Sequence, residues 1–187
     1  DLDNLKPIND LHGHDAGDRV LCQVAGILKG LCRASDFVVR WGGDEFVLLC
    51  RDADLTAAAE LAERIRSTVA KQIFRVYDGL VVRTSCSIGF APFPFIADAP
   101  ASVTWEQTLA IADAALYQAK RDRNDWVGWG GTALAAELPN LQKSIETDLD
   151  SLNKQGVLDI RRRALAVEDT VDRLRLPARG DLGGDGR

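Results

Sequence analysis

The stretch Arg33–Phe46, RASDFVVRWGGDEF, decides how the first half of this chain folds. It places two runs of β-branched and aromatic residues, 37–39 and 46–50, on either side of two adjacent glycines. Such runs are typical of strands, and paired glycines adopt positive φ at low cost, so the pattern predicts a β-hairpin. Asp44 and Glu45 then lie at the hairpin tip, where two neighbouring carboxylates call for a positively charged partner.

The composition limits the function classes. The 187 residues carry 28 acidic and 23 basic side chains and are 46% hydrophobic, which suffices for a sizeable buried core. The surplus of acids disfavours a protein that coats nucleic acid, because such a protein needs a basic face. No apolar run approaches the ~18 residues of a membrane span and no leader is recognisable, so we expect no membrane segment in this chain.

The four cysteines stand singly in apolar runs, at positions 22, 32, 50 and 86. Without a CxxC motif or a Cys/His cluster, they favour buried free thiols over disulfides or a zinc site. We therefore expect a reducing compartment, the cytoplasm, while an anchor elsewhere in a parent protein is left open. The chain lacks methionine and opens directly on Asp1-Leu-Asp3, which suggests a piece of a longer protein.

Two helices are predicted on either side of the first hairpin. Leucine and valine recur at three- and four-residue steps over about 16–31, and Gly13 and Gly17 are expected in the turn that leads into this helix. Asp54 is placed to cap an alanine-rich helix that ends near Gln72.

A second hairpin and a third helix follow. Strands over 74–77 and 80–90 flank Asp78-Gly79, a favoured hairpin turn. After a proline-rich loop, the pattern Thr104-x-x-Gln107 forms a capping box that starts a helix running to Lys120.

The C-terminal part changes character. Pro139 can open a helix that continues to Leu152, and apolar residues from Ile160 to Leu174 repeat at heptad-like spacing. This pattern predicts two helices that pack as a hairpin, either against the sheet or in a dimer. Residues 130–176 are thus interpreted as a helical extension, and the glycine-rich residues 177–187 as a flexible tail.

Three carboxylates are expected to meet at one point. Asp1 lies at the end of a predicted strand and can approach Asp44 and Glu45 if the strands are neighbours. Oxygen ligands without a nearby His or Cys favour Mg²⁺ or Mn²⁺, which suits phosphoryl chemistry. For each acid taken alone, the alternative is a solvated side chain in a turn.

Five blocks of the sequence stand in a defined order. They are Asp1-Leu-Asp-Asn-Leu-Lys-Pro-Ile-Asn-Asp10, Gly13-His-Asp-Ala-Gly-Asp18, Arg40-Trp-Gly-Gly-Asp-Glu-Phe46, Ser87-Ile-Gly89 and Ala112-Asp-Ala-Ala-Leu-Tyr-Gln-Ala-Lys120. Their order and spacing resemble the GGDEF domain of diguanylate cyclases over residues 1–129. The resemblance implies an α+β fold in which helices surround a central antiparallel sheet, similar to nucleotidyl cyclases and polymerase palms.

The resemblance also implies an activity. Active members of the family join two GTP molecules into cyclic di-GMP and release two pyrophosphates, with one GTP held by each protomer of a homodimer. A non-catalytic receptor for cyclic di-GMP is the alternative, and a cyclase that makes another cyclic nucleotide is a third possibility. Because the family's first strand begins before the position of Asp1, we expect weak or no turnover from the isolated chain.

The resemblance assigns roles to individual residues. Positions that match the metal ligands are Asp1, the Leu2 carbonyl, Asp44 and Glu45, and those that match catalytic positions are Asp44 as the base, Glu45 and Lys6. Positions that match substrate-binding residues are Asn9, His14, Asp18, Gly42, Gly43, Lys120 and Arg123. Arg123 stands in a segment one residue shorter than the family's usual pattern.

A second ligand site is implied upstream of the glycines. Arg33-x-x-Asp36 stands five residues before Gly42 and resembles the family's inhibitory site, where Arg and Asp bind the guanines of cyclic di-GMP. Arg64 matches an accessory arginine of that site. The alternative is a surface Arg–Asp pair near a helix end.

Overall fold

The computed structural model describes residues 1–164. The elements in chain order are α1 (Leu5–His12), α2 (His14–Leu31), β1 (Phe37–Gly42), β2 (Glu45–Leu49), α3 (Leu55–Lys71), β3 (Phe74–Tyr77), β4 (Leu80–Val82), β5 (Ile88–Phe90), α4 (Trp105–Asp122), β6 (Trp126–Gly131), η1 (Ala133–Glu137), α5 (Leu141–Lys154) and β7 (Leu158–Arg162).

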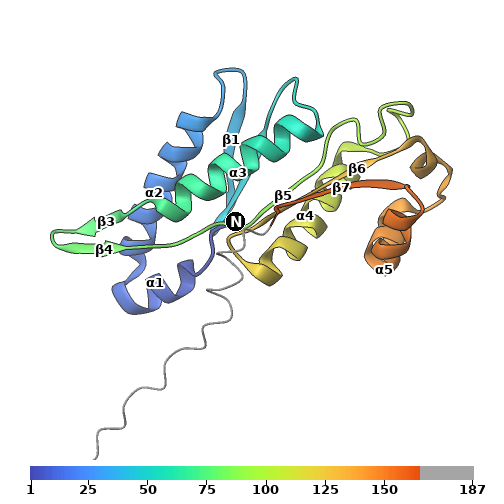
Figure 1. Ribbon diagram of the computed structural model, residues 1–187. Helices are drawn as coiled ribbons and strands as arrows, with labels where there is room; N and C mark the ends of the chain where they lie inside the picture. The colour runs from blue at the N-terminus through green and yellow to red at the C-terminus, as the bar shows by residue number, and fades with distance from the viewer. Residues whose placement is uncertain (165–187) are drawn as a thin grey trace, which may run out of the picture.

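The molecule has two hydrophobic cores side by side (Figure 1). One core lies among α1, α2, α3 and β3, where Val20, Val69 and Phe74 are fully buried. The other lies among α4, β6, α5 and β7, with Trp129 and Ile111 at its centre. The N-terminus lies at the junction between the two halves (Figure 1), so residues at the start of the chain can contact both.

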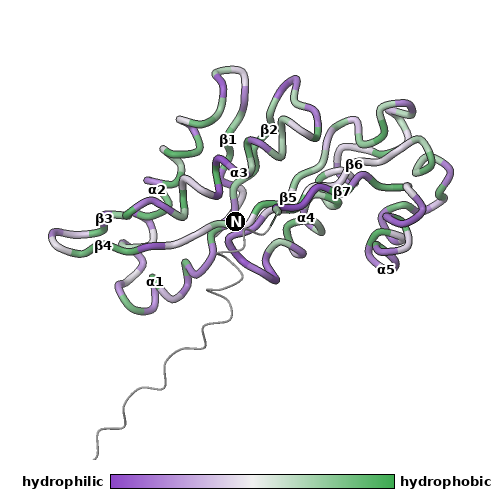
Figure 2. Tube along the Cα trace, in the orientation of Figure 1, coloured by the Kyte–Doolittle hydropathy of each residue, from purple (hydrophilic) through white to green (hydrophobic). Residues whose placement is uncertain are grey.

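The hairpin predicted around the two glycines is confirmed. β1 pairs with β2 in antiparallel fashion from Phe37 opposite Leu49 to Gly42 opposite Glu45, and Gly43 has φ of 42°. Figure 2 shows hydrophobic stretches in the two strands of the hairpin, and only Val38 of β1 is partly buried. Val38 packs against the first core, whereas Trp41 is 65% exposed.

The predicted caps of the two long helices are confirmed. Asp54 accepts a hydrogen bond from the backbone nitrogen of Ala57 at 2.7 Å, which starts α3. Thr104 and Gln107 form a reciprocal capping box at the start of α4. These caps satisfy helix N–H groups that otherwise have no partner, so local sequence suffices to place the starts of both helices.

Two local predictions are corrected. Gly17 was expected in a turn but lies inside α2, where an added Cβ would stand 1.9 Å from Oδ1 of Asn9. A side chain at position 17 would therefore have to displace the Asn9 amide, which comes from α1, a helix that the sequence patterns did not indicate. The strand expected over 80–90 is divided into β4 and β5, because residues 83–87 leave the hairpin and contact the start of the chain.

The sheets are also smaller than expected. β1–β2 and β3–β4 are antiparallel pairs, and β5, β6 and β7 form a third sheet in which β5 and β6 run parallel. The α+β class is confirmed, but the strands are not joined in one antiparallel sheet among residues 1–164.

The C-terminal extension is only partly helical. The helix predicted from Pro139 is present as α5, but residues 160–164 do not begin a second helix. Within the described residues 160–164, Ile160 lies in β7 and pairs with Trp129 of β6. This sheet pairing satisfies the backbone of β7 and buries Leu158 in the second core, which outweighs the heptad-like spacing. The rest of that prediction, from Val167 to Leu174, and the predicted tail lie outside the described residues.

In the part of the chain that the structure describes, no helix combines the length and the hydrophobicity needed to cross a membrane.

Candidate functional site

The opening residues lie between the hairpin tip and the segment that precedes β5. The backbone nitrogen of Leu2 donates to the carbonyl oxygen of Asp44 at 3.2 Å, and the backbone nitrogen of Ser87 donates to the carbonyl of Asp1 at 3.0 Å. Leu2 also forms an antiparallel bridge with Cys86. The contact predicted between the start of the chain and the hairpin tip is therefore present in the backbone.

The Asp1 side chain is only 6% exposed and forms an ion pair with Lys120, with 2.8 Å between Oδ2 and Nζ. A buried carboxylate needs such a partner because its desolvation is costly. The three acidic side chains do not gather as expected: among residues 1–164, no group of three His, Cys, Asp or Glu side chains is arranged to hold a metal ion. Asp44 is half-buried and Glu45 is exposed at the hairpin tip.

Asp3 is a buried acid that the sequence reasoning did not single out. It is 5% exposed and accepts hydrogen bonds from Oγ of Ser85, from Oγ of Ser87 at 2.9 Å and from the backbone nitrogen of Asn124 at 3.0 Å. Asp3 thus joins the start of the chain to the segment before β5 and to the turn after α4. Ser85 and Ser87 are two residues apart, so in an extended segment their hydroxyls face the same side. This spacing is the sequence signal that could have indicated one buried partner for both.

The turn after α4 presents Arg123 to the start of α1. Arg123 and Asn124 have positive φ values of 54° and 46°, and Nη1 of Arg123 donates to Oδ1 of Asn4 at 2.9 Å. Positive φ is uncommon for residues other than glycine, so tertiary contacts must hold this turn. The predicted phosphate cations Lys120 and Arg123 are therefore brought to the two ends of the Asp1–Asn4 segment.

A hydrogen-bond network connects this turn to α3. Oδ1 of Asn124 accepts from Nη1 of Arg66 at 2.9 Å, and Arg66 pairs with Glu63 at 2.6 Å. Trp126 also donates its indole N–H to Glu63 at 2.9 Å. The hydrogen bonds from Arg66 have the largest effect on the pKa of Glu63 and lower it below its ordinary value. The hydrogen bond from Trp126 adds to this effect, and burial opposes it.

The predicted guanine-binding residues lie on the two N-terminal helices. Asn9 is on α1 and faces Gly17 of α2, and Asp18 follows directly on the exposed side. Oδ1 of Asn9 is buried and has no hydrogen-bond partner among residues 1–164. A buried acceptor without a partner is costly, so a donor that reaches this atom would stabilise it. Lys6, three residues before Asn9, and His14 are both exposed.

The residues of the predicted inhibitory site lie around the end of α2. The Asp36 carboxylate accepts from the backbone nitrogen of Arg33 at 2.8 Å and from that of Arg51 at 3.1 Å. The hydrogen bond from the Arg33 backbone, and to a smaller extent that from the Arg51 backbone, lowers the pKa of Asp36 below its usual range. Arg64 of α3 donates to the carbonyl of Leu31 at 3.1 Å. Arg64 and Arg33 therefore both lie close to the turn that follows α2.

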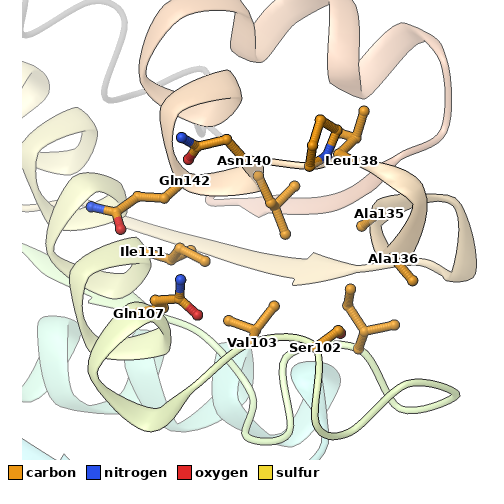
Figure 3. Close-up of a pocket in the computed structure, with 12 residues that line it drawn as sticks. Ser102, Val103, Gln107, Ile111, Ala135, Ala136, Leu138, Asn140 and Gln142 are labelled. Carbon is orange, nitrogen blue, oxygen red and sulfur yellow. The ribbon is translucent and has the colours of Figure 1, made fainter.

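Two hollows lie away from these residues. A small cavity of about 100 Å³ lies between α4 and the start of α5 and is lined by Gln107, Ile111 and Gln142, among others (Figure 3). A wider groove of about 930 Å³ lies beside β3 and β4 and is lined by Arg19 and Arg75, among others. Within the described residues, neither hollow is lined by a residue of the predicted sites.

Comparison with known proteins decides the family. Residues 1–125 match the family model described as "Diguanylate cyclase, GGDEF domain". The chain belongs to the GGDEF domain family. Diguanylate cyclase A of Treponema denticola is 38% identical over 122 residues, which cover 65% of this chain and 31% of that protein. The chain thus spans about a quarter to a third of the length of the first curated relatives that it matches.

Solved structures of GGDEF domains are similar to this one. A Pseudomonas aeruginosa protein reduced to its GGDEF domain is 36% identical, with a TM-score of 0.61 and 78% coverage of both chains. The GGDEF domain of DgcB from Caulobacter crescentus, in complex with c-di-GMP, is 29% identical with a TM-score of 0.58, covering 65% of this chain and 68% of that one. The recognition made from the five sequence blocks is confirmed.

Proposed function

We propose that this GGDEF domain is a diguanylate cyclase that condenses two GTP molecules into cyclic di-GMP and two pyrophosphates. The observation that carries the proposal is the hydrogen bond from Leu2 to Asp44, because it puts the acidic start of the chain beside the acidic hairpin tip. Lys120 lies at the same place, paired with Asp1. The carboxylates suit a divalent metal ion, and the lysine ammonium suits the triphosphate that the metal accompanies.

The residues at this junction fit a divalent metal in their chemistry. Asp1, Asp44, Glu45 and the Leu2 carbonyl offer only oxygen donors, which Mg²⁺ and Mn²⁺ prefer. Since their side chains are not gathered into a cluster among residues 1–164, nucleotide phosphates would supply the remaining ligands. When bound, the metal neutralises the triphosphate and lowers the pKa of the attacking 3′-hydroxyl.

The remaining residues would bind and orient the nucleotide. Lys120 and Arg123, with Lys6, would hold the phosphates. Asn9 and Asp18 would read guanine, because the Asn9 acceptor has no partner in the described chain and Asp18 is exposed beside it.

Three roles rest on the family pattern. Asp44 would accept the proton of the attacking hydroxyl, and Gly42 and Gly43 leave room for the nucleotide at the hairpin tip. His14, exposed at the start of α2, would contribute to the substrate pocket.

The reaction would need two copies of the domain. Each holds one GTP, and each 3′-hydroxyl attacks the α-phosphorus of the other nucleotide, so the proposed active form is a homodimer with the two sites facing each other. Use of GTP and the four free cysteines are consistent with the proposed cytoplasmic location.

Incubation with GTP and Mg²⁺ tests the activity. We expect cyclic di-GMP and pyrophosphate in a 1:2 ratio, measured by chromatography and a pyrophosphate assay, and no cyclic product from ATP because Asn9 and Asp18 suit guanine. The same assay measures how fast the chain converts GTP. A cyclic product from ATP at an equal rate would contradict the guanine assignment.

Binding of cyclic di-GMP tests the proposed inhibitory site. Arg33→Ala is expected to weaken binding by roughly 10- to 100-fold, because a hydrogen bond to a charged group is worth about 1.5–3 kcal/mol. Calorimetric titration measures the change, with Asp44→Ala as the matched control that should bind normally. If Arg33→Ala binds as tightly as the original chain, the inhibitory site lies elsewhere.

The same titration separates the two candidate functions. Tight binding of cyclic di-GMP without any turnover of GTP would favour the receptor alternative over the enzyme.

A further inference from the structure

Two cysteines that the proposed function does not use lie next to each other. Cys32 caps the end of α2 and Cys50 follows β2, and the two thiols lie near enough for each to affect the pKa of the other. Both are free and partly exposed. Cys22 is exposed on α2, and Cys86 is buried against Leu2, so the prediction that the cysteines are buried holds for Cys86 alone.

The backbone on both sides of the thiol pair is held together by Asp36. Its carboxylate accepts from the backbone nitrogens of Arg33 and Arg51, each of which directly follows one of the two cysteines. The β1–β2 register leads to the same place, since Phe37 pairs with Leu49 and the next positions outward are Asp36 and Cys50. The fold therefore brings the two cysteines near each other, although 17 residues separate them in the sequence.

We propose that Cys32 and Cys50 form an oxidation site, a dithiol that peroxides convert to an intramolecular disulfide. One thiolate attacks the peroxide, breaks its O–O bond and becomes a sulfenic acid, with release of one water. The second thiolate attacks that sulfur and displaces the oxygen as a second water. Overall, two thiols and one hydrogen peroxide give one disulfide and two waters.

The groups around Cys32 and Cys50 set the pKa of the two thiols, and thereby the rate of oxidation. Burial, with Asp36 adding to it, raises the pKa of both thiols, and that of Cys50 reaches about 11. Arg64 opposes the increase for Cys32, and Arg33 opposes it for Cys50. Because the thiolate is the nucleophile, the oxidation rate rises about tenfold per pH unit below these pKa values.

Oxidation would act on the residues proposed to bind cyclic di-GMP. The disulfide ties the residue before Arg33 to the end of β2, and Arg64 already contacts Leu31 on the other side of Cys32. The turn from Arg33 to Asp36 is thereby fixed relative to the hairpin. This consequence for the ligand rests on the proposed function, whereas the disulfide itself does not.

Peptide mapping after treatment with hydrogen peroxide tests the oxidation site. All variants carry Cys22→Ser, so that an exposed thiol cannot form intermolecular disulfides. We expect a product lighter by two hydrogens in which a Cys32–Cys50 peptide pair is found without reduction, and full recovery of both thiols after dithiothreitol. Cys32→Ser and Cys50→Ser should each abolish the linked pair, and Cys86→Ser should leave it unchanged. Amide hydrogen exchange at residues 33–36 should slow in the oxidised form.

Two outcomes would overturn the inference, a different cysteine pairing and oxidation of Cys32 and Cys50 only to separate sulfinic acids. A linked pair without change in exchange at residues 33–36 would confirm the disulfide and remove its effect on the turn. Titration of the reduced and oxidised forms with cyclic di-GMP then measures whether the disulfide changes the binding affinity. If the reduced form does not bind it, the proposed inhibitory site fails while the mapping still decides the disulfide.

Discussion

Asp3→Ala is expected to lower the free energy of unfolding by about 3–5 kcal/mol, because three donors lose a common buried acceptor and each unpaired donor costs about 1–3 kcal/mol. The donors are the two serine hydroxyls and the backbone nitrogen of Asn124. In a chain of this size the loss corresponds to a melting temperature lower by roughly 10 °C. Urea and thermal unfolding followed by circular dichroism measure both quantities.

Two further variants sharpen this prediction. Asp3→Asn keeps one acceptor oxygen and should lose about half as much stability. Glu60→Ala, which removes an exposed acid from α3, should change stability by less than about 0.5 kcal/mol. If Asp3→Ala were as stable as Glu60→Ala, the Asp3 hydrogen bonds would not hold the junction together.

Asp44→Ala should lower cyclic di-GMP synthesis by about 10³-fold or more, because a general base contributes about 10²–10⁴-fold and a metal ligand is lost with it. The fold should be retained, since Asp44 contacts Leu2 through its backbone carbonyl and not through its side chain. Initial rates of product formation from GTP at saturating Mg²⁺ measure the effect.

The controls separate catalysis from folding. Asp44→Asn keeps the size of the side chain and should be nearly as inactive, whereas Glu60→Ala, on an exposed residue of α3, should be fully active. Equal rates for Asp44→Ala and Glu60→Ala would remove Asp44 from the catalytic residues. Unchanged melting temperatures for all three variants would assign any loss of rate to chemistry.

Features that depend on near neighbours could be predicted from the sequence. The hairpin around Gly42 and Gly43 and the caps made by Asp54 and Thr104 are formed by residues a few positions apart, so their geometry is already implied by residue type. The sequence blocks also identified the family, because five motifs in one order are specific even when each is weak. Helix α1 was missed, since it has only eight residues and one of them is a proline.

Features that depend on distant partners could not be predicted in this way. Burial of Asp3 needs donors 82 to 121 positions away in the sequence. Ile160 lies in a strand because it pairs with the edge of β6, and its heptad-like spacing did not indicate this.

By itself, the sequence determined the α+β class, the hairpin tip with its two acids and the family, because local chemistry and motif order carry that information. Only the tertiary structure decided that Asp1 pairs with Lys120, that Asp3 holds the junction and that Cys32 meets Cys50. Each of these contacts arises where segments distant in the chain pack together, and the physical cause is the burial of charges and polar groups that must then find partners.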